Sequence, residues 1–396
     1  MQLQIEKGSD SFYAGCILCG QCEFKRIPSY WTHSMTTAGK FVTESLSKAQ
    51  CMSCGLLQRV EIRQLGQTDF YEKHYGFYER PGAAVYDRPR YRAMAKWIKN
   101  ALNEFTPSTI LDAGCGRGWM MQAMFDEFPT SSFLGIEPSE QENINARENG
   151  LNVIEAKIET NLVLDKRFDL IYSTNVVEHT TNPIDFLEAL KRLLNNEGCI
   201  VLTCPDSSIP SAEFMFSDQN YSFTPHQLLQ LAEKAGLYVA AWKPAPDNPS
   251  LRHKQLIILS KNEPSVTKDN LSSTTPIEEL YCRRCEYVQS YVACDEFLQQ
   301  QIQDCQNIYN FGTSTWSLLL SAYCPNYWQK VTACTIDKVK ERSSFQGKPV
   351  RSLNELNTGS KDAFMLGVNP ETQSEFQKKL AANGLNCIRW DHIISG

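Results

Sequence analysis

The stretch Ile110-Leu111-Asp112-Ala113-Gly114-Cys115-Gly116-Arg117-Gly118 joins a short apolar run to three alternate glycines. Glycine has no Cβ, so this sequence suits a place where the backbone turns sharply and approaches a ligand closely. The residues from Trp119 onward have helical apolar spacing, and the first amides of that helix would face the same ligand. The stretch therefore predicts a ligand-binding loop, which suits a pyrophosphate and the carboxylate of a methionyl group equally well.

Helical and strand-like patterns alternate around this loop, from about residue 86 to residue 261. The strand-like runs are Thr109–Asp112, Ser132–Glu137, Asn152–Ile154, Phe168–Ser173 and Cys199–Thr203. The helical patterns are Tyr91–Phe105, Trp119–Phe128, Asn143–Glu148 and Pro183–Leu194. Alternation of this kind predicts an α/β fold with a parallel sheet that is covered on both faces.

The strand after the loop ends at Glu137, where a carboxylate can accept both hydroxyls of an adenosine ribose. An enzyme that binds NADP would need a basic group at this place. The alternate glycines also differ from the Gly-x-Gly-x-x-Gly fingerprint of dinucleotide-binding loops. Both features favour a nucleoside-containing ligand other than NADP.

Three successive motifs resemble those of class I S-adenosylmethionine methyltransferases. They are Ile110–Gly118, Gly135-Ile136-Glu137-Pro138-Ser139 and Phe168-Asp169-Leu170-Ile171-Tyr172-Ser173-Thr174-Asn175-Val176-Val177-Glu178-His179, and the resemblance covers roughly residues 90 to 245. It implies that S-adenosylmethionine is the cofactor. It also implies that the glycine loop holds the methionyl end, that Glu137 holds the ribose, and that the segment from Asn175 to His179 lines the methyl-transfer cleft.

The expected cofactor contacts come from these motifs and from the strand between them. They are Asp112, Gly114, Gly116, Glu137, Pro138, Ile158 and Asn175. The family often places an acidic residue near the adenine after its third strand, where this chain has Ala156-Lys157-Ile158-Glu159.

Two Cys-x-x-Cys pairs near the start of the chain predict a zinc site. Cys16-Ile17-Leu18-Cys19-Gly20 is mirrored by Cys51-Met52-Ser53-Cys54-Gly55. Each pair can chelate through two thiolates, and two pairs complete a closed tetrahedral site, so the zinc would be structural and would supply folding energy. Cys22 is a rival ligand. A third pair, Cys282 and Cys285, has no partner pair and lies in a helical pattern, which favours a role without metal.

Length and composition divide the chain into three units. Residues 1–85 form the predicted zinc module with a tyrosine-rich segment, residues 86–261 the S-adenosylmethionine-binding domain, residues 262–276 a polar linker, and residues 277–396 a Rossmann-like α/β domain. This arrangement resembles the sugar C-methyltransferases that act on nucleotide-linked deoxysugars. In the last unit, Phe311-Gly312 and Asp337 occupy the places of a nucleotide loop and a ribose carboxylate, and a substrate-clamping role is the alternative.

The residues expected to contact the methyl acceptor differ from those of the sugar C-methyltransferases. Their Tyr-His-Glu-His signature aligns with Phe216-Ser217-Asp218-Gln219, and Gln219 cannot take a proton, which puts C-methylation in doubt. Methylation of an oxygen, with His179 or Asp218 as the base, remains open. Tyr75 is a further catalytic candidate. Tyr78 and Tyr221 are candidates for binding a sugar or diphosphate through their hydroxyl groups.

Bulk properties restrict the partners. The formal net charge of −6 offers no basic field for a nucleic acid, so a small molecule, such as a nucleotide sugar, is the expected substrate. The start of the chain lacks the pattern of a signal peptide and no run has membrane-spanning length, so a cytoplasmic location is expected. Two rival hypotheses are a non-catalytic zinc-containing scaffold and an NAD-dependent oxidoreductase. The oligomeric state is left open.

Overall fold

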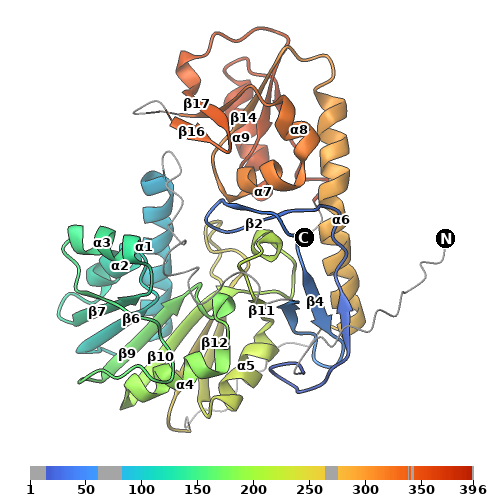
Figure 1. The fold of residues 1–396 in the computed structure, drawn as a ribbon. Coiled ribbons are helices and arrows are strands. Elements are labelled where there is room, and N and C mark those ends of the chain that lie inside the picture. Colours follow the sequence, from blue (N-terminus) through green and yellow to red (C-terminus); the bar gives the residue numbers. More distant parts are fainter. Residues whose placement is uncertain (1–14, 61–82, 264–274, 338, 340–342, 395–396) are drawn as a thin grey trace.

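The computed structural model describes residues 15–60, 83–263, 275–337, 339 and 343–394 of the 396-residue chain (Figure 1). The centre of the fold is a seven-stranded sheet with the strand order β12-β13-β10-β9-β6-β7-β8. Its strands are β6 (Thr109–Ala113), β7 (Ser132–Glu137), β8 (Val153–Glu155), β9 (Phe168–Thr174), β10 (Leu194–Pro205), β12 (Tyr238–Pro244) and β13 (Lys254–Ser260). β13 runs antiparallel to both of its neighbours, β10 and β12, and the other neighbouring strands of this sheet pair in parallel.

Helices cover both faces of this sheet, as predicted. They are α1 (Ala83–Ala101), α2 (Trp119–Glu127), α3 (Glu140–Glu148), α4 (Pro183–Leu193) and α5 (Pro225–Lys234). Successive side chains of a strand point to opposite faces of the sheet, so each strand contributes side chains to two hydrophobic cores. Ile110 packs with residues of α1 and α2, whereas Leu111 packs with residues of α4 and α5. The α/β class predicted from the alternating pattern is confirmed.

The helix predicted over Tyr91–Phe105 is displaced in the structure. Helix α1 begins at Ala83, before the predicted start, and contains Pro89. The helix ends at Ala101, because Asn103 takes a left-handed conformation with φ 52°. None of the described helices is both long and apolar enough to cross a membrane.

The N-terminal module, residues 15–60, is built on an antiparallel sheet of order β1-β4-β5-β11. Its strands are β1 (Phe24–Arg26), β4 (Lys48–Cys51) and β5 (Leu57–Arg59), and β11 (Tyr221–Ser222) joins them from the central part of the chain. A small hairpin of β2 (Ser34–Met35) and β3 (Phe41–Val42) completes the module. The module therefore shares a sheet with the part of the chain that follows it.

The tail begins with the long helix α6 (Ile277–Gln301), which lies along the N-terminal module (Figure 1). Its sheet has the order β16-β17-β15-β14-β18-β19. The strands are β14 (Asn307–Phe311), β15 (Ala333–Ile336), β16 (Ser343–Phe345), β17 (Lys348–Ser352), β18 (Asp362–Leu366) and β19 (Cys387–Ile388), and the other helices are α7 (Thr315–Tyr323), α8 (Pro325–Lys330) and α9 (Gln373–Ala381). Short 3₁₀ turns complete the described fold: η2 (Val177–His179), η3 (Ala212–Met215), η4 (Leu353–Glu355) and η5 (Pro370–Thr372).

Candidate cofactor and acceptor site

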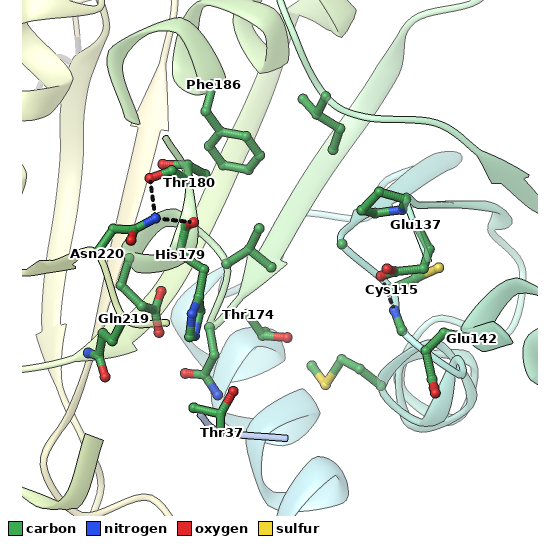
Figure 2. Close-up of a pocket in the computed structure, with 18 of the residues that line it drawn as sticks. Thr37, Cys115, Glu137, Glu142, Thr174, His179, Thr180, Phe186, Gln219 and Asn220 are labelled. Carbon is green, nitrogen blue, oxygen red and sulfur yellow. Dashed lines mark hydrogen bonds between the residues drawn. The ribbon is translucent and has the colours of Figure 1, made fainter. Parts of the chain in front are cut away.

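A cavity of about 520 Å³ lies at the carboxyl ends of β6, β7 and β9. Residues of all three parts of the chain line it: Thr37 and Ala38 come from the N-terminal module, and Thr315 and Leu318 come from α7 in the tail. Figure 2 shows the two ends of this cavity. Cys115 and Glu137 lie at one end, while His179, Gln219 and Thr37 lie at the other. A cavity of this size and position suits a ligand at the switch point of an α/β sheet.

The glycine loop forms one end of the cavity. Gly114, Gly116 and Gly118 have φ values of 87°, 52° and 81°, in the region that disfavours side chains. A Cβ at Gly114 would come within 2.5 Å of Val176 Cγ2, and one at Gly118 would overlap Leu151. Gly116 lines the cavity, and a Cβ at this position would meet no atom of a residue other than its chain neighbours within 4 Å. The backbone at Gly116 is therefore open to a close approach by a ligand.

Glu137 lies beside this loop and is tied to it. Its Oε2 accepts a hydrogen bond from the Gly116 amide at 2.8 Å, and its Oε1 accepts one from the Ser139 amide at 2.9 Å. Burial raises the pKa of Glu137 to about 7, although both amides favour the charged form. Each carboxylate oxygen has a second lone pair, so Glu137 can still accept two hydroxyls of a ribose.

Asp112 lies outside the cavity lining and is fully buried. Its Oδ2 accepts a hydrogen bond from the Tyr172 hydroxyl at 2.8 Å, and its Oδ1 has no hydrogen-bond partner among the described residues. Burial raises the pKa of Asp112 to about 8, against the opposing effect of the Tyr172 hydroxyl. Direct contact between Asp112 and a cofactor is therefore not supported.

His179 forms the opposite end of the cavity, on η2. Its Nδ1 lies 2.8 Å from the backbone oxygen of Asp218. A carbonyl oxygen can only accept, so Nδ1 carries the proton and the lone pair is on Nε2. The side chain of Asn220 holds the backbone of the same turn by donating to the His179 carbonyl at 2.8 Å (Figure 2). The imidazole is thus fixed in the tautomer of a general base.

Lys254, Glu213 and Glu178 are among the charged residues that line the cavity; Glu178 lies in the segment expected to line the cleft, whereas no motif predicts Lys254 or Glu213. The Lys254 ammonium, at the start of β13, donates to Glu213 at 2.8 Å and to Asn175 Oδ1 at 3.1 Å. Burial opposes the charged form of Glu213, but Lys254 outweighs it and lowers the pKa of Glu213 to about 2. Burial raises the pKa of Glu178, whose Oε2 has no hydrogen-bond partner among the described residues. Lysine only donates, so Asn175 must present its oxygen to Lys254 and can offer its NH₂ group elsewhere.

Comparison with known proteins identifies the central part of the chain. Residues 86–241 match a family model described as a methyltransferase domain. The chain contains a methyltransferase domain. The match confirms the class I methyltransferase fold that the glycine loop and the two later motifs predict. It begins after Thr37 and ends before Lys254, so both of these cavity residues lie outside the matched range.

Curated relatives share this domain over part of their length. A tRNA U34 carboxymethyltransferase from Nautilia profundicola is 34% identical over 121 residues, which cover 28% of this chain and 39% of that protein. A ubiquinone biosynthesis O-methyltransferase from Histophilus somni is 26% identical over 114 residues, which cover 26% of this chain and 48% of that protein. The chain thus spans less than half the length of these two relatives.

Solved structures resemble the chain more weakly. An S-adenosylmethionine-dependent methyltransferase from Clostridium acetobutylicum is 12% identical, with a TM-score of 0.36, and covers 45% of this chain and 95% of that chain. The plantazolicin methyltransferase BamL in complex with a triazolic desmethylPZN analog and SAH is 18% identical, with a TM-score of 0.40, and covers 50% of this chain and 95% of that chain. Likeness at this level supports no statement about ligands. The resemblance to sugar C-methyltransferases stays a prediction.

Within the methyltransferase domain, all predicted cofactor residues except Asp112 line the cavity. Their contact with a cofactor stays a prediction. Asp218 and Tyr221 do not line the cavity. Both oxygens of Asp218 accept hydrogen bonds from Thr37, and the Tyr221 hydroxyl donates to the Thr181 carbonyl at 3.1 Å while its strand pairs with β5. A base at Asp218 and a substrate contact at Tyr221 are therefore not supported. Tyr75 and Tyr78 lie outside the described residues.

The four cysteines predicted to bind zinc lie together in the N-terminal module. The sulfur atoms of Cys16, Cys19, Cys51 and Cys54 all lie within 4.8 Å of one another. Tetrahedral zinc with thiolates at about 2.3 Å separates its sulfurs by about 3.8 Å, so the cluster fits this metal. Cys22 is exposed and stands outside the cluster, which favours the predicted set over this rival.

The knuckle turns and the tail glycine have structural explanations. Gly20 and Gly55 both take φ 75° and donate back to the first cysteine of their pair, at 2.7 and 2.8 Å. In the tail, a Cβ at Gly312 would lie 2.9 Å from the Gly367 carbonyl, so close packing already requires a glycine there. Asp337 is exposed at the end of β15.

Proposed function

We propose that the chain is an S-adenosylmethionine-dependent methyltransferase that methylates an oxygen of a small hydroxylated acceptor, such as a sugar or a nucleotide-linked sugar. One observation carries the proposal. The tautomer of His179 leaves a lone pair on Nε2, and His179 lies at the end of the cavity opposite the glycine loop. The cavity therefore combines a seat for a nucleoside-containing cofactor with a base for an acceptor.

When bound, S-adenosylmethionine would supply an electrophilic methyl group on a sulfonium. The protein's part is alignment and proton transfer, because methyl transfer is an in-line displacement. His179 Nε2 would accept the hydroxyl proton of the acceptor as the acceptor oxygen takes the methyl group, with S-adenosylhomocysteine as the leaving group. The NH₂ group of Asn175, turned away from Lys254, can orient an acceptor oxygen beside it.

The polar character of the acceptor end supports a hydroxylated acceptor. Thr37, Gln219 and Asn220 line this end together with His179. Amides and hydroxyls both donate and accept hydrogen bonds, as the hydroxyl groups of a sugar require. Gln219 stands where the sugar C-methyltransferases carry a histidine, and an amide cannot remove a proton from carbon. We therefore propose oxygen, and not carbon, as the methylated atom.

Isothermal titration calorimetry with S-adenosylhomocysteine, S-adenosylmethionine and NAD tests the cofactor. We expect both S-adenosyl compounds to bind and NAD not to bind. Binding of NAD alone would support an oxidoreductase, and binding of none of the three by the zinc-loaded chain would support a scaffold. Either result would refute the proposal.

A panel of sugars, nucleotide sugars and phenols, followed by S-adenosylhomocysteine formation, tests the acceptor class. We expect turnover with at least one hydroxylated compound and loss of turnover in H179Q, which keeps the hydrogen-bonding capacity but not the basicity. Exposed His226 on α5 gives the matched control H226Q, which should keep wild-type turnover. Equal turnover by H179Q would remove His179 as the base.

We also propose that the four-cysteine cluster holds a structural zinc ion, since four thiolates leave no open coordination position. Metal analysis of the purified chain should give one zinc per chain, and none in a C51S variant. Retention of zinc by C51S would reject this ligand set.

A further inference from the structure

One face of helix α6 packs against the second Cys-x-x-Cys turn of the N-terminal module (Figure 1). A Cβ at Gly55 would lie 3.4 Å from Leu280 Cδ2 and 3.7 Å from Ile277 Cγ1, so this turn is in van der Waals contact with the helix. The Gln50 side chain donates to the Ile277 carbonyl at 2.8 Å. Arg284 lies on the same face, because it follows Leu280 by four residues. The start of α6 therefore lies directly beside the proposed zinc site.

Arg284 brings a positive charge into this contact, and it is only 1% exposed. Its Nη1 donates to Gln50 Oε1 at 2.7 Å and to the Gly55 carbonyl at 2.8 Å. Its Nη2 donates to the Ser207 hydroxyl at 3.2 Å. These three partners belong to strand β4, to the zinc turn and to the segment after β10. One guanidinium thus connects the tail with the N-terminal module and the methyltransferase domain.

The hydrogen-bond partners of Arg284 are all neutral. An amide, a carbonyl and a hydroxyl accept from it, and no carboxylate of a described residue forms an ion pair with it. Two other buried cations of the N-terminal module do have a negative partner. Arg59 lies 3.6 Å from the Glu44 carboxylate, and Asp218 attracts Lys48. A buried cation without a counter-charge is costly, so the position of Arg284 calls for a negative group that is not a carboxylate.

A zinc–thiolate cluster would supply that negative charge. Four thiolates around one Zn²⁺ leave an excess of negative charge on the cluster. Arg284 binds the carbonyl of Gly55, which directly follows the predicted ligand Cys54. Because Arg284 is buried, water screens its attraction to the cluster only weakly.

We propose that Arg284 is the counter-charge of the zinc cluster, so that the tail supplies a positioning residue for the metal site of the N-terminal module. The inference rests on the proposed structural zinc. The same module contributes Thr37 and Ala38 to the cavity, so zinc and the tail together hold this part of the acceptor end in place.

Competition with a chromogenic chelator measures the zinc affinity of the full chain. R284Q keeps hydrogen-bond donors but removes the charge, and it should bind zinc about 10- to 100-fold more weakly than the wild type, as changes beside metal ligands typically do. R284K keeps the charge and should recover most of this loss. Arg283 is exposed and pairs with Glu279 on the same helix, so R283Q is the matched control and should keep wild-type affinity.

Urea unfolding of zinc-loaded and chelator-treated samples separates the charge effect from a loss of packing. R284Q should lower the free energy of unfolding of the zinc-loaded chain. It should not lower that of the zinc-free chain, because the zinc-free wild type buries a cation without its counter-charge. A role in packing alone would lower both values equally, and that result would overturn the proposal.

Wild-type zinc affinity in R284Q, or an affinity of R284K as weak as that of R284Q, would also overturn it. If R284Q does not fold, R284M against R284K gives the same comparison. The zinc content of the wild type separates the two ideas. A wild type without zinc refutes the zinc site itself, whereas equal affinities of the wild type and R284Q refute only the role of Arg284.

Discussion

Replacing Glu137 by glutamine should weaken S-adenosylhomocysteine binding by about 10- to 150-fold. The carboxylate accepts the Gly116 and Ser139 amides at 2.8 and 2.9 Å, and its remaining lone pairs face the proposed ribose site. Glutamine keeps the shape but turns one acceptor into a donor, so one of these charged acceptors is lost. A hydrogen bond to a charged group contributes about 1.5–3 kcal/mol, which corresponds to this range of affinities.

The pH dependence sharpens the same prediction. Because burial raises the pKa of Glu137 to about 7, the carboxyl is largely protonated at pH 6 and ionised at pH 8. The ionised form accepts both ribose hydroxyls, so affinity should rise by up to about tenfold over this window. E137Q has no ionisable group at this position and should lose that rise, although Asp112, with its pKa near 8, remains in both proteins.

Titration calorimetry at pH 6, 7 and 8 measures both effects. Glu140 lies on α3, close in sequence to Glu137, and is exposed, so E140Q is the matched control and should bind as the wild type does. Thermal unfolding of each variant checks that the fold is kept. If E137Q binds as tightly as E140Q at pH 8, Glu137 does not hold the ribose and the assignment of this end of the cavity is wrong.

Three other perturbations give distinct outcomes. H179Q should lower kcat at least about 100-fold with unchanged calorimetric affinity for S-adenosylhomocysteine, because a general base typically contributes 10²–10⁴-fold; a tenfold weaker affinity would point to a binding role instead. K254M should lower the free energy of unfolding in urea at pH 7, because the Glu213 carboxylate loses the ammonium that pairs with it, and K254M/E213Q should regain part of that loss. In the wild type, the contribution of ionised Glu213 to stability should disappear as pH falls from about 4.5 through about 2. Removal of zinc by a chelator should lower Tm in the wild type and in C22S alike, since exposed Cys22 lies outside the cluster; loss of zinc from C22S would contradict the ligand set.

Five strands of the central sheet, β6 to β10, could be predicted because each contains a short apolar run, whereas β12 and β13 were not predicted. Helix starts were harder to place. Helix α3 begins at Glu140, three residues before its predicted start, because the Ser139 side chain accepts the Glu142 amide and caps it. In the tail, the residues after Gly312 form two helices, since Pro325 cannot continue α7.

Local motifs also predicted the part of the cavity that lies at the carboxyl ends of β6, β7 and β9. The glycine loop, Glu137 and His179 each follow a strand at a carboxyl edge, so parallel topology alone brings them together. The zinc cluster could be predicted for a similar reason, because each Cys-x-x-Cys pair places two thiolates on one tight turn. Asp218 was named as a candidate base from its alignment with a family signature. The orientation of its side chain depends on Thr37, which no motif marks.

The other half of the cavity depends on contacts between distant parts of the chain. Thr37 reaches Asp218 across 181 positions, and Lys254 reaches Asn175 across 79 positions. Neither contact leaves a periodic or spacing signal, because each depends on how a whole sheet or module docks. The match to the methyltransferase domain begins after Thr37 and ends before Lys254, so part of the proposed acceptor end is contributed from outside that domain. Substitutions at Thr37 and Lys254 should therefore change acceptor selectivity, while the cofactor end, built wholly inside the domain, keeps its affinity for S-adenosylhomocysteine.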